Sequence, residues 1–404
     1  MKFKFAGAGS QPAPVGVPVS LAACHAAWQR TRRGKKPSAN QLAFEARWLD
    51  RLQALCTTLR KGGWQPARTV SFVVKHPKTR EIHAPDFADR VVHHLLVERL
   101  EKLYEPVFIH DSYANRAGWG SHAAVDRLQS FMCQRENMPG PHPESGSTAA
   151  GWYLQLDIHN FFNSIHHPTL YAMLCQRLAL AEKRRQLPAR HVLALRSLCH
   201  KLLARRMPEL VRDPAAAALV PPHKRLCNAA PCCGLPVGNL SSQFFANVYL
   251  NALDQFVKDT LKVRHYLLYV DDFVLLASSR EQLVQWQIGV LLREELRLKY
   301  KDGTVLEPCT QEWIFWATAC MRTIGWCARV WRATAAPGSA NGSCGSSGTA
   351  GLSGCGLPIL PDCRRCWAAT GATLPMLTAC ACAAVCLRAC RGCRSISPCR
   401  LTPV

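Results

Sequence analysis

Two adjacent carboxylates, Asp271 and Asp272, stand between two strongly apolar segments, LLYV and FVLLA. The pattern indicates two β-strands joined by a tight turn. Adjacent like charges beside an apolar sheet raise each other's pKa and destabilise the fold unless cations neutralise them. A two-residue hairpin turn ordinarily takes Asn-Gly or Asp-Gly instead. The pair is therefore a candidate for metal-assisted chemistry, while the alternative is a plain acidic surface turn.

A third carboxylate, Asp157, closes the apolar segment YLQLD and is followed by IHNFFNSI. An aspartate in this place can simply cap a helix. Taken with Asp271 and Asp272, it suggests two Mg²⁺ ions held by carboxylates from separate strands, which activate an attacking 3′-hydroxyl group and stabilise a leaving pyrophosphate. Mg²⁺ prefers hard oxygen ligands and keeps water and substrate phosphates, so few protein ligands suffice.

Hydrophobic periodicity indicates the elements that would position these carboxylates. Apolar residues recur at helical intervals in residues 21–62 (with a basic break at 30–36), 90–104, 170–206 and 243–262. Short apolar segments indicate strands at 70–74, 81–84, 153–157, 266–270 and 273–277. The first two strands are expected to form a hairpin that turns through residues 76–79. Residues 135–150 are expected to form a loop, and residues 208–233 are expected to be irregular.

The charge of the chain favours a polyanionic partner. Its 404 residues include 50 Lys and Arg against 27 Asp and Glu, a formal net charge of +23, as expected for a protein that binds nucleic acid or a membrane surface. No run of 18 or more apolar residues is present, which argues against a membrane span. Pro12, Pro14 and Pro18 interrupt any signal-like stretch at the N-terminus. We therefore expect a cytoplasmic protein.

Five segments resemble, in the expected order, the motifs of bacterial reverse transcriptases. YVDDF resembles their Tyr-x-Asp-Asp box, and LDIHNFFNSI resembles their first palm motif. The others are HPKTREIHAPDFADRVVHHLL, similar to a fingers segment, DSYANRAGWGSHAAV, similar to the next motif, and GLPVGNLSSQFFANVYLNALDQFVK, similar to the motif before the catalytic box. Together they cover about residues 70–277. One short motif would be weak evidence, but five in order are specific.

The resemblance implies a ligand set for two Mg²⁺ ions. Asp157 and Asp271 would bind both metals, Asp272 would support them, and the Ile158 carbonyl would add an oxygen. The three aspartates would thus be the catalytic residues of template-directed deoxynucleotide transfer.

The resemblance also assigns residues to the incoming deoxynucleoside triphosphate. Lys78 and Arg80, on the hairpin, would grip the triphosphate, although as bare sequence they could form a solvated basic turn. Phe162, five positions after Asp157, would be an aromatic gate that excludes the sugar 2′-hydroxyl group by bulk, whereas its plainer role is core packing beside Phe161. Trp119 departs from the family, which often has a basic residue there.

One motif indicates a subtype. Most of the family has Gln-Gly-x-x-x-Ser-Pro where this chain has VGNLSSQ, so that Val237 replaces Gln, Gly238 is kept, and Gln243 replaces Pro. This variant resembles the reverse transcriptases of diversity-generating retroelements, which copy a template RNA with frequent errors opposite adenine. The loss of a side-chain amide near the nucleotide removes a polar contact that could hold the base pair in register, which makes poorer discrimination plausible.

The resemblance implies an α+β right-hand polymerase fold with three regions. Residues 1–68 would be an N-terminal helical region, and 69–308 would form the fingers and a palm with an antiparallel sheet plus helices. The thumb that should follow would be lost or out of frame in residues 309–404. The expected partners are template RNA, a cDNA primer–template duplex, deoxynucleoside triphosphates and a small basic accessory protein, with no membrane.

The composition of residues 309–404 indicates a segment translated out of frame. It holds thirteen of the 21 cysteines, no Lys, His or Tyr, and only Glu312 and Asp362 as acids, which is unusual for a folded cytosolic domain. We therefore predict a disordered Cys-rich tail. A metal module is the alternative, but no histidine or repeated CxxC framework supports it.

The genetic code allows a direct check of this frameshift. When each codon of WIFWAT (residues 313–318) begins one base earlier, any choice of synonymous codons yields Asp, then one of Ile, Leu or Phe, then Leu and Gly. The next residue can be Tyr. Asp-Phe-Leu-Gly-Tyr is thus an allowed sequence, and it resembles the Phe-Leu-Gly-Tyr segment that follows the palm in bacterial reverse transcriptases.

Other functions stay open at this stage. Within the family the rival is a retron, defence-linked or group II intron-like reverse transcriptase, which the residues at 237 and 243 argue against. The rival of another class is a catalytically dead RNA-binding remnant. The intact aspartates Asp157, Asp271 and Asp272 argue against that remnant.

Overall fold

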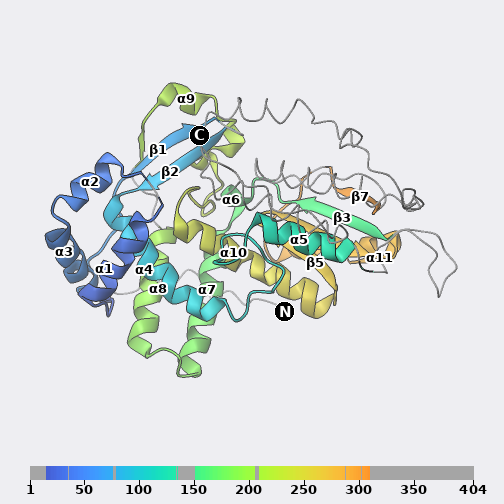
Figure 1. Ribbon diagram of the computed structural model, residues 1–404, viewed down its shortest axis with the longest axis horizontal. Helices are drawn as coiled ribbons and strands as arrows, with labels where there is room; N and C mark the ends of the chain where they lie inside the picture. Colours follow the sequence, from blue (N-terminus) through green and yellow to red (C-terminus); the bar gives the residue numbers. More distant parts are fainter. Residues whose placement is uncertain are drawn as a thin grey trace, which may run out of the picture. The chain divides into compact units, whose positions relative to one another are not determined.

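The computed structural model describes residues 15–34, 36–75, 79–132, 134, 151–204, 209–286, 288–301 and 303–309. These residues form helices and two β-sheets (Figure 1) and belong to one compact unit. The mixture of helix and sheet agrees with the expected fold class. Lys78, the loop at 135–150 and residues 310–404 lie outside the described residues, so the expectations for them, including the frameshifted tail, stay predictions.

Four helices confirm the helical periodicity expected at residues 21–62 and 90–104. They are α1 (Leu21–Arg32), α2 (Ala39–Glu45), α3 (Trp48–Arg60) and α4 (Phe87–Tyr104). Ser20 and Ser38 cap α1 and α2 by accepting hydrogen bonds from the backbone amides three residues on, as serine caps commonly do. The fourth helix begins three residues earlier than expected because Asp86 caps it, accepting a bond from the Ala88 amide (2.9 Å).

The first sheet has the strand order β2-β1-β4. Strands β1 (Thr69–Val74) and β2 (Arg80–Pro85) pair antiparallel, as the hairpin expectation requires, and β4 (Glu209–Val211) adds to β1 in parallel. The expectation of an irregular segment at 208–233 was wrong in part. This segment holds β4, helix α9 (Pro214–Ala218) and the 3₁₀ turns η2 (Pro222–Lys224) and η3 (Leu226–Asn228). Elements of three to five residues are too short to show periodicity.

The second sheet has the order β5-β6-β3-β7, with all of its neighbours antiparallel. Its strands are β3 (Trp152–Asp157), β5 (His265–Tyr269), β6 (Asp272–Ala277) and β7 (Val305–Pro308). The strands expected at 153–157, 266–270 and 273–277 are confirmed to within one residue. Strand β7 pairs with β3, and the Cys309 amide donates to the Gly151 carbonyl (2.7 Å). The packed chain therefore reaches at least residue 309.

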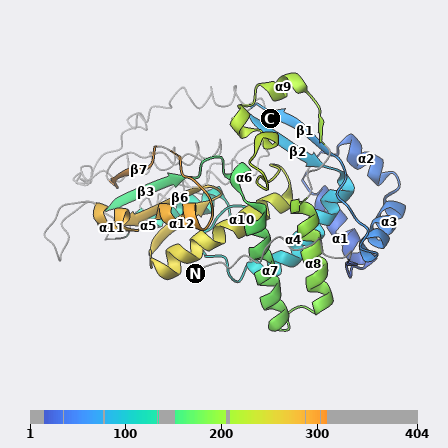
Figure 2. The ribbon, with the colours of Figure 1, turned by 180° about the vertical axis from the view of Figure 1, so that it is seen from behind.

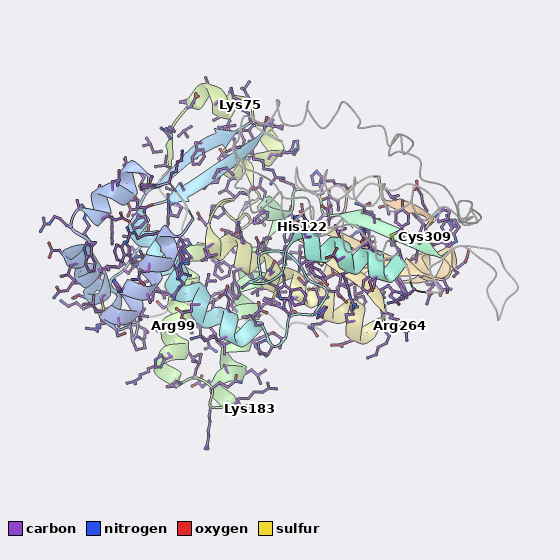
Figure 3. The ribbon with its side chains drawn as sticks, viewed as in Figure 1. Lys75, Arg99, His122, Lys183, Arg264 and Cys309 are labelled. Carbon is purple, nitrogen blue, oxygen red and sulfur yellow. The ribbon has the colours of Figure 1, made fainter. Side chains whose placement is uncertain are left out.

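The remaining helices connect and cover the sheets (Figures 1 and 2). They are α5 (Ser121–Met132), α6 (Phe161–Ser164), α7 (His167–Lys183), α8 (Ala189–Ala204), α10 (Leu240–Gln255), the π-helical turn η4 (Phe256–Thr260), α11 (Arg280–Gln285) and α12 (Ile288–Glu294). The helical stretch expected at 170–206 is two helices, and Lys183 extends from their joining tip (Figure 3). Among the described residues, none of the helices combines the length and hydropathy needed to cross a membrane.

Side chains of the second sheet alternate between two hydrophobic clusters. Tyr153 and Val274 pack with Val125 and Leu128 of α5 on one face. On the other face, Leu154, Phe273 and Leu275 join a large core that includes Phe245 of α10 and extends to the N-terminal helices. This alternation is the two-residue period of a strand. Burial on both faces explains why its strands read as continuous apolar runs.

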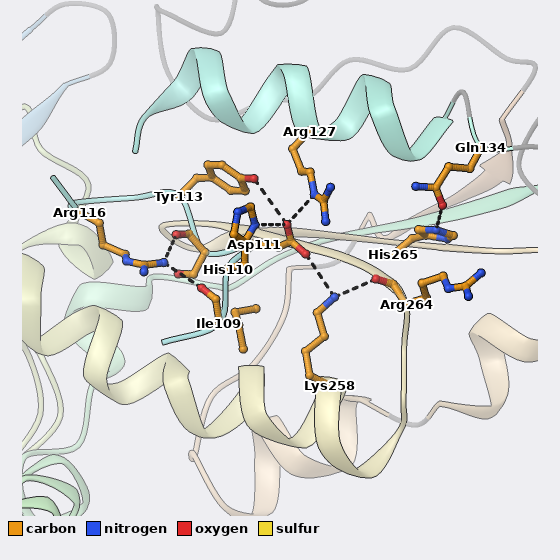
Figure 4. A network of polar contacts seen from close by, with 11 residues as sticks. Ile109, His110, Asp111, Tyr113, Arg116, Arg127, Gln134, Lys258, Arg264 and His265 are labelled. Carbon is orange, nitrogen blue, oxygen red and sulfur yellow. Dashed lines mark hydrogen bonds and ion pairs between the residues drawn. The ribbon is translucent and has the colours of Figure 1, made fainter. Parts of the chain in front are cut away.

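A buried carboxylate ties the edge of this sheet to its flanking elements (Figure 4). The segment around Asp111 runs beside β5, and the Leu268 amide donates to the Asp111 carbonyl (2.9 Å). The Asp111 carboxylate accepts a bond from Arg127 of α5 (2.8 Å) and pairs with Lys258 of η4 (3.4 Å). Asp111 therefore links α5, η4 and β5.

Candidate active site

The register of the second sheet brings two of the predicted aspartates together. Asp157, the last residue of β3, lies directly opposite Asp272, the first residue of β6. Cβ atoms of directly opposite residues in an antiparallel pair are about 5 Å apart. Two carboxylates, 115 positions apart in the sequence, therefore face each other at one end of the sheet.

The turn between β5 and β6 differs from the expected one. Tyr269 pairs with Asp272, so that the two-residue turn is Val270-Asp271 and Asp272 belongs to the strand. Val270 has a φ of +58°, which is strained for a β-branched residue and is found chiefly where the surrounding structure enforces it. The Ile158 amide donates to the Asp271 carbonyl (3.1 Å). This bond holds the turn against the end of β3.

Burial and a neighbouring carboxylate raise the pKa of Asp271, but that carboxylate is Asp157 and not the adjacent Asp272 of the sequence expectation. Burial and then the charge of Asp157 raise the pKa of Asp271, the charges of Lys301 and Arg80 act in the opposite direction, and the net result is a pKa of about 6. Asp272 is only 3% exposed. Carboxylates crowded in this way favour a cation at the site.

Lys301 is a site residue that the sequence analysis missed. Its ammonium group contacts the Asp157 carboxylate, and the side chains are 48% and 28% exposed. Residues 299–301 pair with 157–159, through bonds from the His159 amide to the Lys299 carbonyl (2.7 Å) and from the Lys301 amide to the Asp157 carbonyl (2.8 Å). No local pattern marks this lysine, because only the long-range pairing brings it to the aspartates.

The donor set is suited to a hard cation that keeps water and substrate ligands. Carboxylate oxygens are what Mg²⁺ prefers. Among the described residues, the buried Oδ1 atom of Asp157 has no hydrogen-bond partner, and such an atom normally has one. Within the same residues, no group of three or more His, Cys, Asp or Glu side chains is arranged to hold a metal by itself. The residues therefore fit a metal site in which the protein supplies some of the ligands and water or substrate supplies the rest.

The β1–β2 hairpin of the first sheet carries a positive charge that acts on Asp271. Arg80, the first residue of β2, is exposed, and its charge lowers the pKa of Asp271. Lys75, at the end of the hairpin, is labelled in Figure 3. Lys78, the other predicted triphosphate ligand, lies outside the described residues. The structure thus brings one of the two predicted cations toward the aspartates.

Phe162 lies in α6, a single helical turn that follows β3. It is half-buried and packs against the core, with its ring 5.5 Å from that of Phe161, which is buried. Both the gate and the packing role are therefore compatible with its position.

The Val237-Gly238 segment lies against β2. The His83 amide donates to the Val237 carbonyl (2.8 Å). Gly238 has a φ of +110°, and a Cβ atom there would lie 2.9 Å from Ile82 Cγ2, so that the position requires glycine. Gln243 lies in the first turn of α10, half-buried.

Residues 73–295 match the family model described as "Reverse transcriptase (RNA-dependent DNA polymerase)". This match covers more than half of the chain and includes Asp157, Asp271 and Asp272. The chain belongs to the reverse transcriptase family. The family expected from the five motifs is thereby confirmed, while the diversity-generating subtype stays a prediction.

Individual relatives of this reverse transcriptase are distant and match over part of their length. Protein YkfC of Escherichia coli (strain K12) is 27% identical over 144 residues, which is 35% of each chain. The group II intron-encoded protein LtrA of Lactococcus lactis subsp. cremoris is 25% identical over 211 residues, 52% of this chain and 28% of LtrA. Telomerase from Candida albicans, solved in complex with a fragment of telomeric RNA, aligns over 63% of this chain and 44% of its own, with a TM-score of 0.40 and 13% identity. The chain thus spans about a third of the length of these curated relatives.

Proposed function

We propose that this chain is an RNA-directed DNA polymerase that copies a template RNA into cDNA. The observation that carries the proposal is the meeting of Asp157, Asp271 and Asp272 at one end of an antiparallel sheet inside a reverse transcriptase domain. Carboxylates so placed suit the transfer of a deoxynucleotide to a 3′-hydroxyl group.

We assign the parts of a right-hand polymerase to the described elements. The β5-β6-β3-β7 sheet is the palm, and the β1–β2 hairpin belongs to the fingers. Residues 69–308 hold both, and residues 1–68 are a helical extension. The N-terminal helices and the palm share one hydrophobic core, so that these parts pack against one another.

Asp157 and Asp271 would hold two Mg²⁺ ions, with Asp272 in support and the Ile158 carbonyl as a further oxygen ligand. The ions would supply activation of the 3′-hydroxyl group and charge stabilisation of the leaving pyrophosphate. The uncommitted Oδ1 atom of Asp157 supports this ligand set. Lys301, beside Asp157, offsets part of the carboxylate charge.

The nucleotide would lie between the hairpin and the turn that follows β3. Lys78 and Arg80 would bind the triphosphate. The effect of the Arg80 charge on the pKa of Asp271 supports this role for Arg80. Phe162 would exclude a ribose 2′-hydroxyl group by bulk. Template RNA and the cDNA primer–template duplex would be bound mainly through backbone phosphates by a chain of net charge +23. A small basic accessory protein is a further proposed partner.

Replacement of Asp271 tests the catalytic proposal. The Asp271→Asn chain should lose Mg²⁺-dependent primer extension on RNA by about 10²-fold or more, because a ligand charge worth several kcal/mol to the transition state is removed. RNA retention on a filter should stay near that of the parent. The measurement is single-nucleotide extension, made in the 404-residue chain and in one whose reading frame is restored beyond residue 308.

Asp259→Asn is the matched control for this variant. Asp259 is an exposed aspartate at the end of η4, so its loss should leave extension unchanged. Extension by Asp271→Asn at the parental rate would remove Asp271 from the proposed metal site.

We propose further that the polymerase is error-prone and serves a diversity-generating retroelement. Val237 and Gln243, where most of the family has Gln and Pro, support this subtype. Val237 itself contacts β2, through the bond from the His83 amide to its carbonyl, and Arg80 begins that strand. A change at this position can therefore affect how the incoming nucleotide is held.

The subtype predicts a specific error spectrum. The Val237→Gln, Gln243→Pro double variant should misincorporate several-fold less opposite template adenine, because a polar contact worth about 1 kcal/mol would be restored near the base pair. Sequencing of cDNA copies of one RNA measures the error rate at each template base. If the parent already makes no more errors at adenine than at other bases, the subtype is wrong.

A group II intron-like reverse transcriptase is the second candidate, because the match to LtrA covers 52% of this chain. Such an enzyme would give a flat error spectrum in the same experiment. A retron or defence-linked enzyme would also give a flat error spectrum, whereas a catalytically dead RNA-binding remnant would extend no primer.

A further inference from the structure

Residues 222–238, which we call the strap, lie between β2 and the turn that carries Phe162. The strap contains η2 and η3 and ends at Gly238. It reaches both neighbours through hydrogen bonds rather than through a strand of its own. Figures 1 and 2 show α6 close to the β1–β2 sheet and above α10.

The strap is bonded along the Phe162 turn. The Leu235 amide donates to the Phe162 carbonyl (2.8 Å), and the Gly234 amide donates to the Ile165 carbonyl (3.0 Å). Gly234 has a φ of +103°, and a Cβ atom there would lie 2.7 Å from Leu226 Cδ1. Leu226 belongs to the strap as well, so the backbone conformation of the strap at this point requires glycine.

The same strap is bonded to β2 on its other side. The Leu226 amide donates to the Glu81 carboxylate (2.9 Å), and the His83 amide donates to the Val237 carbonyl (2.8 Å). Glu81 is 8% exposed and His83 is 3% exposed. These buried contacts attach the strap to the strand that begins at Arg80.

Side chains of the Phe162 turn also bond to the strap. Asn160 Nδ2 donates to the His223 carbonyl of the strap (2.6 Å), and Asn163 Nδ2 makes a longer bond to the same oxygen (3.4 Å). Asn160 has a φ of +47°, in the left-handed region that Asn tolerates better than most residues. The turn after β3 thus begins with a residue suited both to its backbone and to its partner.

The Phe162 turn cannot hold its position alone. Helix α6 has four residues, and a helix of one turn is unstable without tertiary contacts. The ring position of Phe162 therefore depends on what binds the turn from outside. Two side chains of this turn, Asn160 and Asn163, bond to the His223 carbonyl of the strap, and the Asn160 bond is the shorter of the two.

We propose that Asn160 is a positioning residue for sugar selection. By bonding to the His223 carbonyl, Asn160 fixes the Phe162 turn to the strap. Because the strap is also bonded to β2, the position of the Phe162 ring is set relative to β2 and Arg80. The proposal rests on the proposed function, in which Phe162 excludes the ribose 2′-hydroxyl group. Its action is on discrimination between nucleotides and not on the chemical step, because the Asn160 side chain bonds to the strap.

The test compares single-nucleotide incorporation of GTP and dGTP by the full 404-residue chain at saturating template–primer. The Asn160→Gly variant removes the amide and keeps the left-handed backbone available. It should raise the ratio of kcat/KM for GTP to that for dGTP about five-fold, in line with the loss of one hydrogen bond. The melting temperature of the chain should change little.

Two further variants make the result specific. Asn228→Ala removes a bond of the same kind inside the strap, from Asn228 Nδ2 to the Pro222 carbonyl (2.9 Å), and should leave the ratio unchanged. Phe162→Ala removes the gate itself and should raise the ratio more than Asn160→Gly does.

The outcomes separate this inference from the proposed function. An unchanged ratio in Asn160→Gly, with a raised ratio in Phe162→Ala, overturns the positioning role alone. An equal rise in Asn228→Ala also overturns it, because general loosening of the strap would then be the cause. An unchanged ratio in Phe162→Ala overturns the gate in the proposed function, and failure to extend a primer both in the 404-residue chain and in the chain with its frame restored beyond residue 308 overturns the polymerase.

Discussion

At the scale of single residues, Asp271 occupies a position that is unfavourable for folding. Burial, followed by the charge of Asp157, raises its pKa to about 6. A carboxylate whose folded pKa exceeds its unfolded value binds protons more tightly when folded, so the protein loses stability as the pH rises from about 4 to about 6. Above that range the ionised group costs about 1–3 kcal/mol. Such strain is common where function requires a buried charge.

Asp271→Asn should therefore stabilise the metal-free chain while it abolishes extension. At pH 7.5 in EDTA the free energy of unfolding should rise by about 1–3 kcal/mol, because the buried charge is removed. The gain should vanish below about pH 4, where Asp271 is protonated in both states. Urea denaturation at several pH values measures it, with Asp259→Asn as the control. A variant less stable than its parent at pH 7.5 would contradict this account.

At the scale of elements, the Asp111 contacts show that a motif residue can be structural. Asp111 begins the DSYANR segment, which was read from sequence only as part of a family motif. Burial acts to raise its pKa, but bonds from Arg127 and His110 and the charge of Lys258 outweigh this and hold the pKa below its ordinary value. Its ionised form therefore stabilises the junction of α5, η4 and β5 (Figure 4).

Asp111→Asn should destabilise the fold by about 2–3 kcal/mol near neutral pH, because it leaves Arg127 and the largely buried Lys258 without their carboxylate. Since the folded pKa is depressed, this contribution is present above pH 4 and is lost as the pH falls further. Urea denaturation of both chains at pH 7 and pH 3 measures it. Asp50→Asn is the control, because the Arg47–Asp50 pair is exposed on both sides and should contribute less than about 1 kcal/mol. Equal losses in the two variants would refute the buried link.

At the scale of the whole molecule, two compositions are joined in one chain. Before residue 309 the chain has the motifs, periodicity and buried core of a reverse transcriptase. Residues 309–404 hold thirteen cysteines and no Lys. A segment read in the wrong frame has no selected hydrophobic pattern, so local and global preferences do not agree.

Restoration of the frame beyond residue 308 should supply a thumb. The restored chain should bind template–primer more tightly, with a steeper salt dependence, because a thumb adds contacts to backbone phosphates. Fluorescence anisotropy measures this affinity over roughly 50–200 mM salt, the range in which contacts to backbone phosphates are weakened. Limited proteolysis of the 404-residue chain should leave no resistant fragment from residues 309–404. A resistant fragment with stoichiometric zinc or a defined disulfide set would sink the frameshift hypothesis.

Much of the architecture was predictable because its signals are local. The paired strands around Asp271, the strand that ends at Asp157 and the amphipathic helix α10 each follow from periodicity within one segment. The family followed from five motifs in order. The short elements β4 and α9 were missed because three to five residues carry too little pattern.

By itself, the sequence determined the family, the candidate aspartates and most of the helices and strands, because residue type and spacing suffice for these. Only the tertiary structure decided that Asp272 belongs to a strand opposite Asp157, that Lys301 contacts Asp157, and that Asn160 bonds to the strap. These contacts join residues between 63 and 144 positions apart. They depend on strand register and on the paths of loops, which packing of the whole core sets and which no local pattern encodes.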